Sequence, residues 1–212
     1  MKAFVGSDSA VAIVDLGISN ITSLINGVSE VGFDPCPLSD PTELSKFSRM
    51  IFPGHGNFFR ASALLSSSGW DESVKAFAKS GKPILGICLG MQLMASTGEE
   101  NGHSFGLDLI PGHVKKIDSA GLRTPHVGWN SVTQLRSHKI FNTIRQGCDF
   151  YFSHNYVFEP KNQSAVLCET HYGSSFCSTC SFENIVGVQF HPEKSQRNGL
   201  SVLTEFMNWD GN

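Results

Sequence analysis

The chain has 212 residues, of which 40% are hydrophobic and 17% charged, with a formal net charge of -3 at pH 7. This length accommodates one large domain, and the composition is that of a soluble globular protein. The charge gives no reason to expect nucleic acid or an anionic membrane as a partner, and no apolar run approaches the length of a membrane span. Because the N-terminus lacks the apolar core of a secretory signal, we expect the chain in the reducing cytoplasm.

The first hundred residues alternate strand-like and helix-like segments. The pattern begins with Ala10–Val14, an apolar run typical of a buried parallel strand, and residues 1–9 are expected to be a short N-terminal extension. The alternation predicts a parallel, doubly wound sheet, whose ligands bind beyond the carboxyl ends of the strands. The later segments are a helix from Asn20 to about Val31, an edge strand over Phe33–Leu38, a short helix after an Asp40 N-cap, a strand over Arg49–Gly54, helices over Phe58–Leu65 and Trp70–Lys79, a strand over Pro83–Ile87 and a helix over Gly90–Thr97.

The second half is dominated by short β-like runs separated by turn residues. They predict a mixed or antiparallel extension of the same sheet, and a helix over Gln196–Trp209 closes the chain. Because no repeat, low-complexity tract or long linker interrupts the sequence, we expect one domain over residues 1–212. The β-like runs are His113–Ile117, Ser131–Leu135, Phe150–Phe158, Ser164–His171, Ser175–Phe182 and Ile185–Phe190.

Cys88 occupies the most informative position in the first half. It follows the apolar run Pro83–Ile87 and lies between Gly86 and Gly90, at the start of a predicted helix. This is the thiol version of the G-x-S-x-G nucleophile elbow, in which glycines allow a turn that a Cβ would obstruct. The turn pushes the sulfur out of the sheet at the end of the strand, so we expect a nucleophile that needs a base and an oxyanion donor.

His191-Pro192-Glu193 ends the apolar strand predicted over Ile185–Phe190. Residues i and i+2 of an extended chain lie on the same side, and the proline favours extended geometry at His191. Glu193 is therefore expected beside the imidazole, where it holds the tautomer while His191 serves a nucleophile. Alone this motif is typical of a surface turn. Together with a cysteine at another strand end, it indicates a catalytic pair.

The remaining cysteines and histidines give weaker signals. Cys177 and Cys180 have CxxC spacing, but no second CxxC follows, so we expect two half-buried strand cysteines and no metal site. His55, His126 and His154 lie in predicted glycine- or aromatic-rich loops that can approach the pocket. The histidines expected to be structural or on the surface are His103, His113, His138 and His171.

The two motifs together resemble the class I (triad) glutamine amidotransferases: Gly86-Ile-Cys-Leu-Gly-Met-Gln92 and Gln189-Phe-His-Pro-Glu193. The resemblance covers the chain from about residue 10 to its end. It narrows to the glutaminase subunits of imidazole glycerol-phosphate synthases through Asp15-x-Gly-x-x-Asn20, Pro53-Gly-x-Gly-x-Phe58, Gly106-Leu-x-Leu-Ile-Pro-Gly112, Pro125-His-x-Gly-Trp-Asn130 and Tyr151-Phe-x-His154.

The resemblance implies a single-domain α/β fold, with a mostly parallel central sheet flanked by helices and an antiparallel extension. It implies hydrolysis of glutamine to glutamate and ammonia without a cofactor, by Cys88 as nucleophile, His191 as base and then acid, and Glu193 as its orienting group. The ammonia would pass to a (βα)8-barrel cyclase subunit that makes imidazole glycerol phosphate in histidine biosynthesis. The other implied residues are Gly54, His55, Gly56 and Leu89 for the oxyanion hole; Gln92, Glu100, His154, Asn155 and Tyr156 for glutamine; and Asn20, Pro125, His126, Gly128, Trp129, Asn130 and Lys194 for the face toward the cyclase.

The chain departs from the pattern of the family at a few positions. His55 stands in the oxyanion segment where valine is usual, and Asn155 replaces a serine or threonine. Leu16 and Ser19 replace tyrosine and glycine on the side expected to face the partner. These departures leave open a paralogous glutaminase that supplies another acceptor, such as a sugar amidotransferase of surface polysaccharide biosynthesis. An intact triad argues against a non-catalytic scaffold, and the Trp129 motif argues against a stand-alone cysteine hydrolase.

Overall fold

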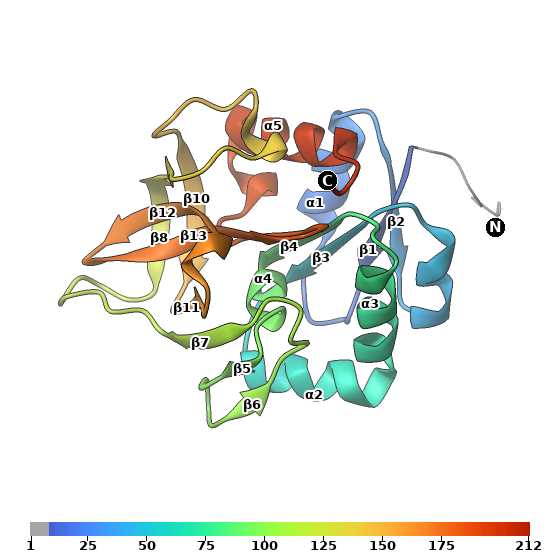
Figure 1. The fold of residues 1–212 in the computed structure, drawn as a ribbon, viewed down its shortest axis with the longest axis horizontal. Coiled ribbons are helices and arrows are strands. Elements are labelled where there is room, and N and C mark those ends of the chain that lie inside the picture. The colour runs from blue at the N-terminus through green and yellow to red at the C-terminus, as the bar shows by residue number, and fades with distance from the viewer. Residues whose placement is uncertain (1–8) are drawn as a thin grey trace.

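The computed structural model describes residues 9–212, so most of the expected N-terminal extension lies outside the described residues. Strands and helices alternate through the first half, as predicted (Figure 1). The first-half elements are β1 (Ala10–Val14), α1 (Thr22–Glu30), β2 (Asp34–Leu38), a 3-10 helix (Pro41–Lys46), β3 (Met50–Gly54), α2 (Phe58–Ser68), α3 (Trp70–Lys79), β4 (Ile84–Cys88) and α4 (Leu89–Leu93).

The second half is mainly β-structure and ends in one long helix. Short 3-10 turns cover Lys139–Phe141, Gln163–Ala165 and Pro192–Lys194. The remaining elements are β5 (Thr97–Gly98), β6 (Ser104–Phe105), β7 (Gly112–Lys116), β8 (His126–Ser131), β9 (Thr133–Gln134), β10 (Asp149–His154), β11 (Tyr156–Pro160), β12 (Val166–Tyr172), β13 (Ser174–Phe182), β14 (Ile185–Val188) and α5 (Gln196–Asn208).

The described residues form a central sheet of eight strands in the order β2-β1-β3-β4-β14-β13-β12-β9. The pairs from β2 to β14 are parallel, and those from β14 to β9 are antiparallel. This confirms the predicted parallel sheet with an antiparallel extension. It also places β2, with its two prolines, at the edge where a missing backbone donor is tolerated.

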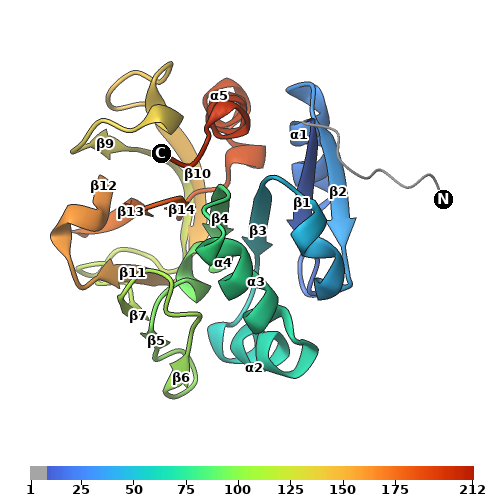
Figure 2. The ribbon, with the colours of Figure 1, turned by 45° about the vertical axis from the view of Figure 1, so that its right-hand side comes forward.

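Helices cover both faces of the sheet (Figures 1 and 2). On one face α1 and α5 bury Leu24, Val28, Val202 and Phe206 in one apolar cluster. On the other face α2 and α3 contribute a second cluster, which includes residues such as Phe58, Leu65, Trp70 and Phe77. Burial of apolar surface on both faces explains why the central strands are continuous apolar runs. No helix among residues 9–212 is long and apolar enough to cross a membrane.

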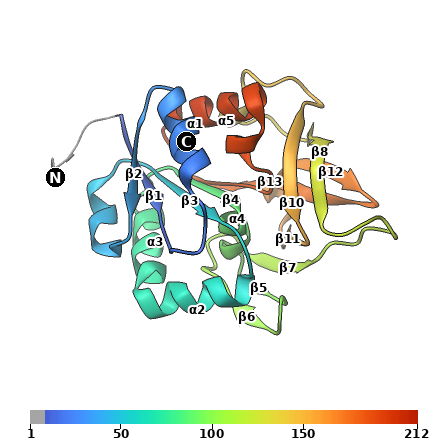
Figure 3. The same cartoon turned by 180° about the vertical axis from the view of Figure 1, so that it is seen from behind.

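The sequence-based picture of the chain after Cys88 needs four corrections. The helix after Cys88 ends at Leu93, and residues 97–98 already belong to a strand. The run predicted over Phe150–Phe158 is two strands, β10 and β11, which break at Asn155 and enter different sheets. The 126–130 stretch is a strand, β8, and β8 with β10 forms a separate antiparallel pair beside β12 (Figure 3). A further small sheet, β11-β7-β5-β6, is not hydrogen-bonded to the central sheet, although β11 packs against β13.

Candidate active site

Cys88 lies on a sharp turn between β4 and α4. Its φ of 54° and ψ of -111° are values that a residue with a side chain rarely adopts. The turn requires glycine at Gly90, because a Cβ there would lie 1.8 Å from the carbonyl oxygen of Phe52. At Gly86 a Cβ would lie 2.5 Å from Cε of Met94. The nucleophile-elbow geometry predicted from the two glycines is therefore present.

His191 and Glu193 lie in contact at the end of the strand that neighbours β4. Nδ1 of His191 is 2.8 Å from Oε1 of Glu193, and both side chains are buried. His191 is extended, with a φ of -100°, but the predicted extended path through Glu193 is wrong, because Pro192–Lys194 is a 3-10 turn. Ser195 fixes this turn, since its hydroxyl donates to the carbonyl of His191 at 2.6 Å and accepts from the N–H of Tyr151 at 2.9 Å.

The charges around His191 favour its protonated form. Burial alone would lower the pKa of His191, but its interactions with Cys88 and with the Glu193 carboxylate outweigh burial and raise that pKa to about 10. Burial would raise the pKa of Glu193, yet the hydrogen bond and positive charge of His191 hold it below its usual value. Since Nδ1 is bonded to Glu193, Nε2 is the nitrogen left to exchange a proton with Cys88.

Gln189 is a site residue that the sequence analysis missed. In the parallel pair of β4 and β14, Val188 lies opposite Ile87, so the next residues, Gln189 and Cys88, are level. The amide Nε2 of Gln189 is 3.6 Å from Sγ of Cys88, and the side chain is fully buried. Gln189 and His191 are two residues apart, and the period-two rule applied to Glu193 could have indicated that both face the thiol.

His55 lies directly over His191. The two rings stack with centroids 4.4 Å apart and an interplanar angle of 17°. Nε2 of His55 is 3.4 Å from Nζ of Lys194, and the backbone N–H of His55 donates to Oγ of Ser19 at 2.8 Å. Burial, followed by the charges of His191 and Lys194, lowers the pKa of His55 to about 4. His55 is therefore a neutral ring that accepts from the lysine ammonium.

We expect His55→Val to retain the glutamine hydrolysis that the resemblance implies, but to lower its kcat several-fold. Valine keeps the backbone N–H but removes both the stack on His191 and the acceptor for Lys194, which leaves the protonated imidazole less supported. The measurement is kcat as a function of pH. His55→Phe is the matched variant, because phenylalanine preserves the stack and removes only the Lys194 contact. Kinetics unchanged in both variants would mean that His55 is a bystander.

A pocket of about 250 Å³ opens beside Cys88. Gly54, at the end of β3, lies directly against the elbow, since a Cβ there would approach the Leu89 Cβ to 2.8 Å. Glu100 accepts from the N–H of Phe58 at 2.6 Å, which ties the pocket wall to the start of α2. Of the residues implied by the resemblance, the pocket is lined by His55, Gly56, Cys88, Leu89, Gln92, Glu100, Pro125, His154, Asn155 and Tyr156; Ser153, which the sequence analysis did not single out, joins them.

The residues implied to face a partner divide into exposed and buried members. On β8, Val127 is 55% exposed and Trp129 is 48% exposed. The two residues are two apart in the strand, so both side chains lie on its free face. Asn20 is exposed and accepts from the N–H of Thr22 at the start of α1. His126 differs, because its side chain is only 2% exposed and points inward. It therefore does not form part of the outer surface.

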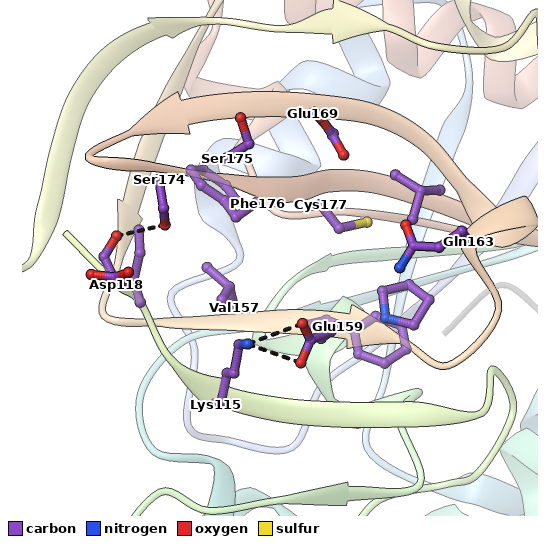
Figure 4. Close-up of a pocket in the computed structure, with 14 residues that line it drawn as sticks. Lys115, Asp118, Val157, Glu159, Gln163, Glu169, Ser174, Ser175, Phe176 and Cys177 are labelled. Atoms are coloured by element: carbon purple, nitrogen blue, oxygen red, sulfur yellow. Dashed lines mark hydrogen bonds and ion pairs between the residues drawn. The ribbon is translucent and has the colours of Figure 1, made fainter. Parts of the chain in front are cut away.

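A second pocket, of about 320 Å³, lies between the β7–β11 and β12–β13 strands, away from Cys88 (Figure 4). Lys115 and Glu159 form an ion pair at 2.9 Å in its wall. Cys177 lines this pocket and Cys180 follows on β13; both are strand cysteines, as predicted, but fully rather than half buried. Within residues 9–212 no group of three His, Cys, Asp or Glu side chains is placed to hold a metal ion.

The chain belongs to the class-I glutamine amidotransferases, because residues 12–208 match the family described as Glutamine amidotransferase class-I. It is similar to the imidazole glycerol phosphate synthase subunit HisH of Moorella thermoacetica, at 42% identity over 92% of this chain and 93% of that protein. The HisH subunit of Syntrophotalea carbinolica is 36% identical over 92% of this chain and 98% of that protein. The structure of PurLQS from Thermotoga maritima shares the fold, with a TM-score of 0.76 at 18% identity over 94% of this chain and 97% of that one.

Proposed function

We propose that the chain is the glutaminase subunit of an imidazole glycerol phosphate synthase, acting in histidine biosynthesis. The observation that carries the proposal is the triad itself: a cysteine on a strained elbow, level with Gln189 and next to the buried His191–Glu193 pair, in a chain 42% identical to a HisH subunit. The relatives named HisH match nearly the whole chain, so the alternative of a paralogous glutaminase that supplies a sugar amidotransferase is not favoured.

The arrangement supports acyl transfer through the thiol of Cys88. The sulfur attacks the side-chain amide carbon of glutamine, and the oxyanion would be held by the N–H of Leu89. His191, protonated through the influence of Cys88 and Glu193, gives its Nε2 proton to the leaving nitrogen, which departs as ammonia. Water then attacks the thioester, with His191 as base, and releases glutamate. The N–H of His55 is bonded to Ser19, so it would join the oxyanion hole only after that bond breaks.

We assign the ammonia acceptor to a (βα)8-barrel cyclase subunit that docks on the face bearing Trp129, Asn130 and Lys194. Support comes from the exposed indole of Trp129, because tryptophan is enriched at protein interfaces relative to the rest of the protein surface. The six cysteines are all free thiols in the described part of the chain, which agrees with a reducing cytoplasm. We treat residues 1–212 as one amidotransferase domain.

The proposal is tested by mixing the chain with the cyclase subunit of its source organism and following glutamine cleavage and imidazole glycerol phosphate formation together. We expect one product per glutamine consumed. Trp129→Ala should lower product formation more than glutamine cleavage, because the indole lies on the docking face and not in the pocket. Lys139→Ala is the matched surface control, since Lys139 is bonded to Asp210 elsewhere. A cyclase partner would be contradicted if the wild type cleaved glutamine without forming imidazole glycerol phosphate, while the same cyclase formed that product from added ammonia.

A further inference from the structure

Two buried histidines are joined across β8 and β10. His126 and His154 lie opposite each other in the antiparallel register, and Nδ1 of His126 is 3.1 Å from Nε2 of His154. Their side chains are 2% and 7% exposed. The ring of His126 also stacks on Tyr172 with centroids 4.0 Å apart, and on Phe152 at 4.9 Å. The ring of His154 packs against Phe176 with centroids 5.1 Å apart, so aromatic contacts restrain both histidine rings.

The hydrogen bonds of this pair run in one direction only. Nδ1 of His154 is 3.0 Å from the carbonyl oxygen of Tyr156, which can only accept, so Nδ1 carries the hydrogen. Nε2 of His154 must then accept from Nδ1 of His126. That leaves Nε2 of His126 as an acceptor for the side-chain amide of Asn130, 3.3 Å away. Each ring therefore has one allowed tautomer.

Burial keeps both rings neutral, as the direction requires. It lowers the pKa of His126 to about 4, and burial together with His126 lowers the pKa of His154 to about 3. A protonated ring would present two donors and could no longer accept from its neighbour.

The same hydrogen-bond chain continues from Tyr156 to the nucleophile. Nε2 of Gln92 donates to the carbonyl of Tyr156 at 2.8 Å and to Oε1 of Gln189 at 2.9 Å. With its oxygen bonded in this way, Gln189 directs its amide nitrogen toward Sγ of Cys88 at 3.6 Å. Gln92 and Gln189 are both buried, so solvent does not interrupt these contacts.

We propose that Gln189, His126 and His154 are positioning residues in a buried hydrogen-bond chain that connects Asn130 on β8 to the sulfur of Cys88. Gln189 donates to the sulfur, and the two histidines hold the pocket segment at Tyr156 from which Gln92 and Gln189 take their orientation. Asn130 also donates to the carbonyl of His171 at 3.0 Å, so its side chain is held at the outer end. The interpretation of that end as a partner contact rests on the proposed function.

The hydrogen-bond chain is tested in the isolated subunit. The measurement is the rate at which iodoacetamide alkylates Cys88, determined for the Cys88 peptide by mass spectrometry over a range of pH. The thiolate is the reacting form, so loss of a donor to sulfur slows alkylation near neutral pH and moves the profile to higher pH. Gln189→Met, which keeps the side-chain volume, should slow alkylation at pH 7 about tenfold. His126→Phe, which keeps the ring stack but lies remote from the sulfur, should slow it about threefold, with partial rescue in His126→Asn.

Tyr172→Phe is the matched control, because it preserves the stack on His126 and removes only the hydroxyl that donates to the carbonyl of Arg123, outside the hydrogen-bond chain. We expect its alkylation profile to match that of the wild type. A wild-type profile in folded Gln189→Met would overturn the proposal at the sulfur end, whether or not His126→Phe folds. A wild-type profile in folded His126→Phe would overturn the connection to β8.

Addition of the cyclase subunit separates this inference from the proposed function. If the partner docks on β8, it should change the alkylation profile of the wild type and change that of His126→Phe much less. If the cyclase leaves the wild-type alkylation profile unchanged while both variants are alkylated more slowly, the proposed partner would be contradicted and the hydrogen-bond chain supported. An equal response to the cyclase in wild type and His126→Phe would contradict transmission through the histidines.

Discussion

Cys88→Ala should reduce glutamine hydrolysis by on the order of 10⁴-fold or more, because removal of a covalent nucleophile leaves only binding and the oxyanion donors. Alanine is smaller than cysteine and keeps a Cβ, so the backbone at φ 54° is no more strained than before. The melting temperature should therefore change little. The measurement is glutamate release with saturating glutamine, with partner present.

Cys36→Ala supplies the matched control for this variant. Cys36 is a half-buried free thiol on the edge strand β2, remote from the pocket. It should retain wild-type turnover. A glutamine-analogue electrophile should label the wild type and Cys36→Ala on Cys88, and should not label Cys88→Ala. Turnover near the wild-type level in Cys88→Ala would exclude the nucleophilic role.

The elements of the site that depend on neighbouring residues were predictable from the sequence. The elbow follows from a cysteine between glycines at the end of an apolar run, because steric clash with the Phe52 carbonyl leaves no alternative to glycine at Gly90. The His191–Glu193 contact follows from residues two apart, even though a 3-10 turn, rather than extended chain, brings them together. The parallel order of the first strands likewise follows from their alternation with helices.

The parts that the sequence could not give depend on contacts distant in the chain. Residues His126 to Ser131 include the turn-forming Gly128 and Asn130, yet they form strand β8 because β10 pairs with them over six residues. The approach of Gln189 to Cys88 depends on the register of β14 against β4. The stack of His55 on His191 joins two strand ends separated by more than a hundred residues, and no local periodicity encodes it.

His191→Asn should lower kcat by about 10²–10⁴-fold, the usual contribution of a general acid and base. Asparagine can still accept or donate near Glu193, but it cannot carry a proton from Cys88 to the leaving nitrogen. His138→Asn is the matched control, since His138 is a half-buried histidine that accepts from the N–H of Ile140 far from the pocket. It should retain activity. Because nucleophile and base act as one unit, His191→Asn combined with Cys88→Ala should be no worse than Cys88→Ala alone.

Glu193→Gln distinguishes the two contributions of the carboxylate to His191. Glutamine can accept the Nδ1–H bond, so orientation survives and the loss of kcat should be smaller than in His191→Asn. The negative charge is gone, however, and that charge helps to raise the pKa of His191 to about 10. The pKa must fall in the variant, and His191 then loses its proton at a lower pH. The alkaline limb of the kcat profile should therefore move toward neutral pH, since only the protonated ring can donate to ammonia. An alkaline limb unchanged in Glu193→Gln would mean that the carboxylate acts by orientation alone.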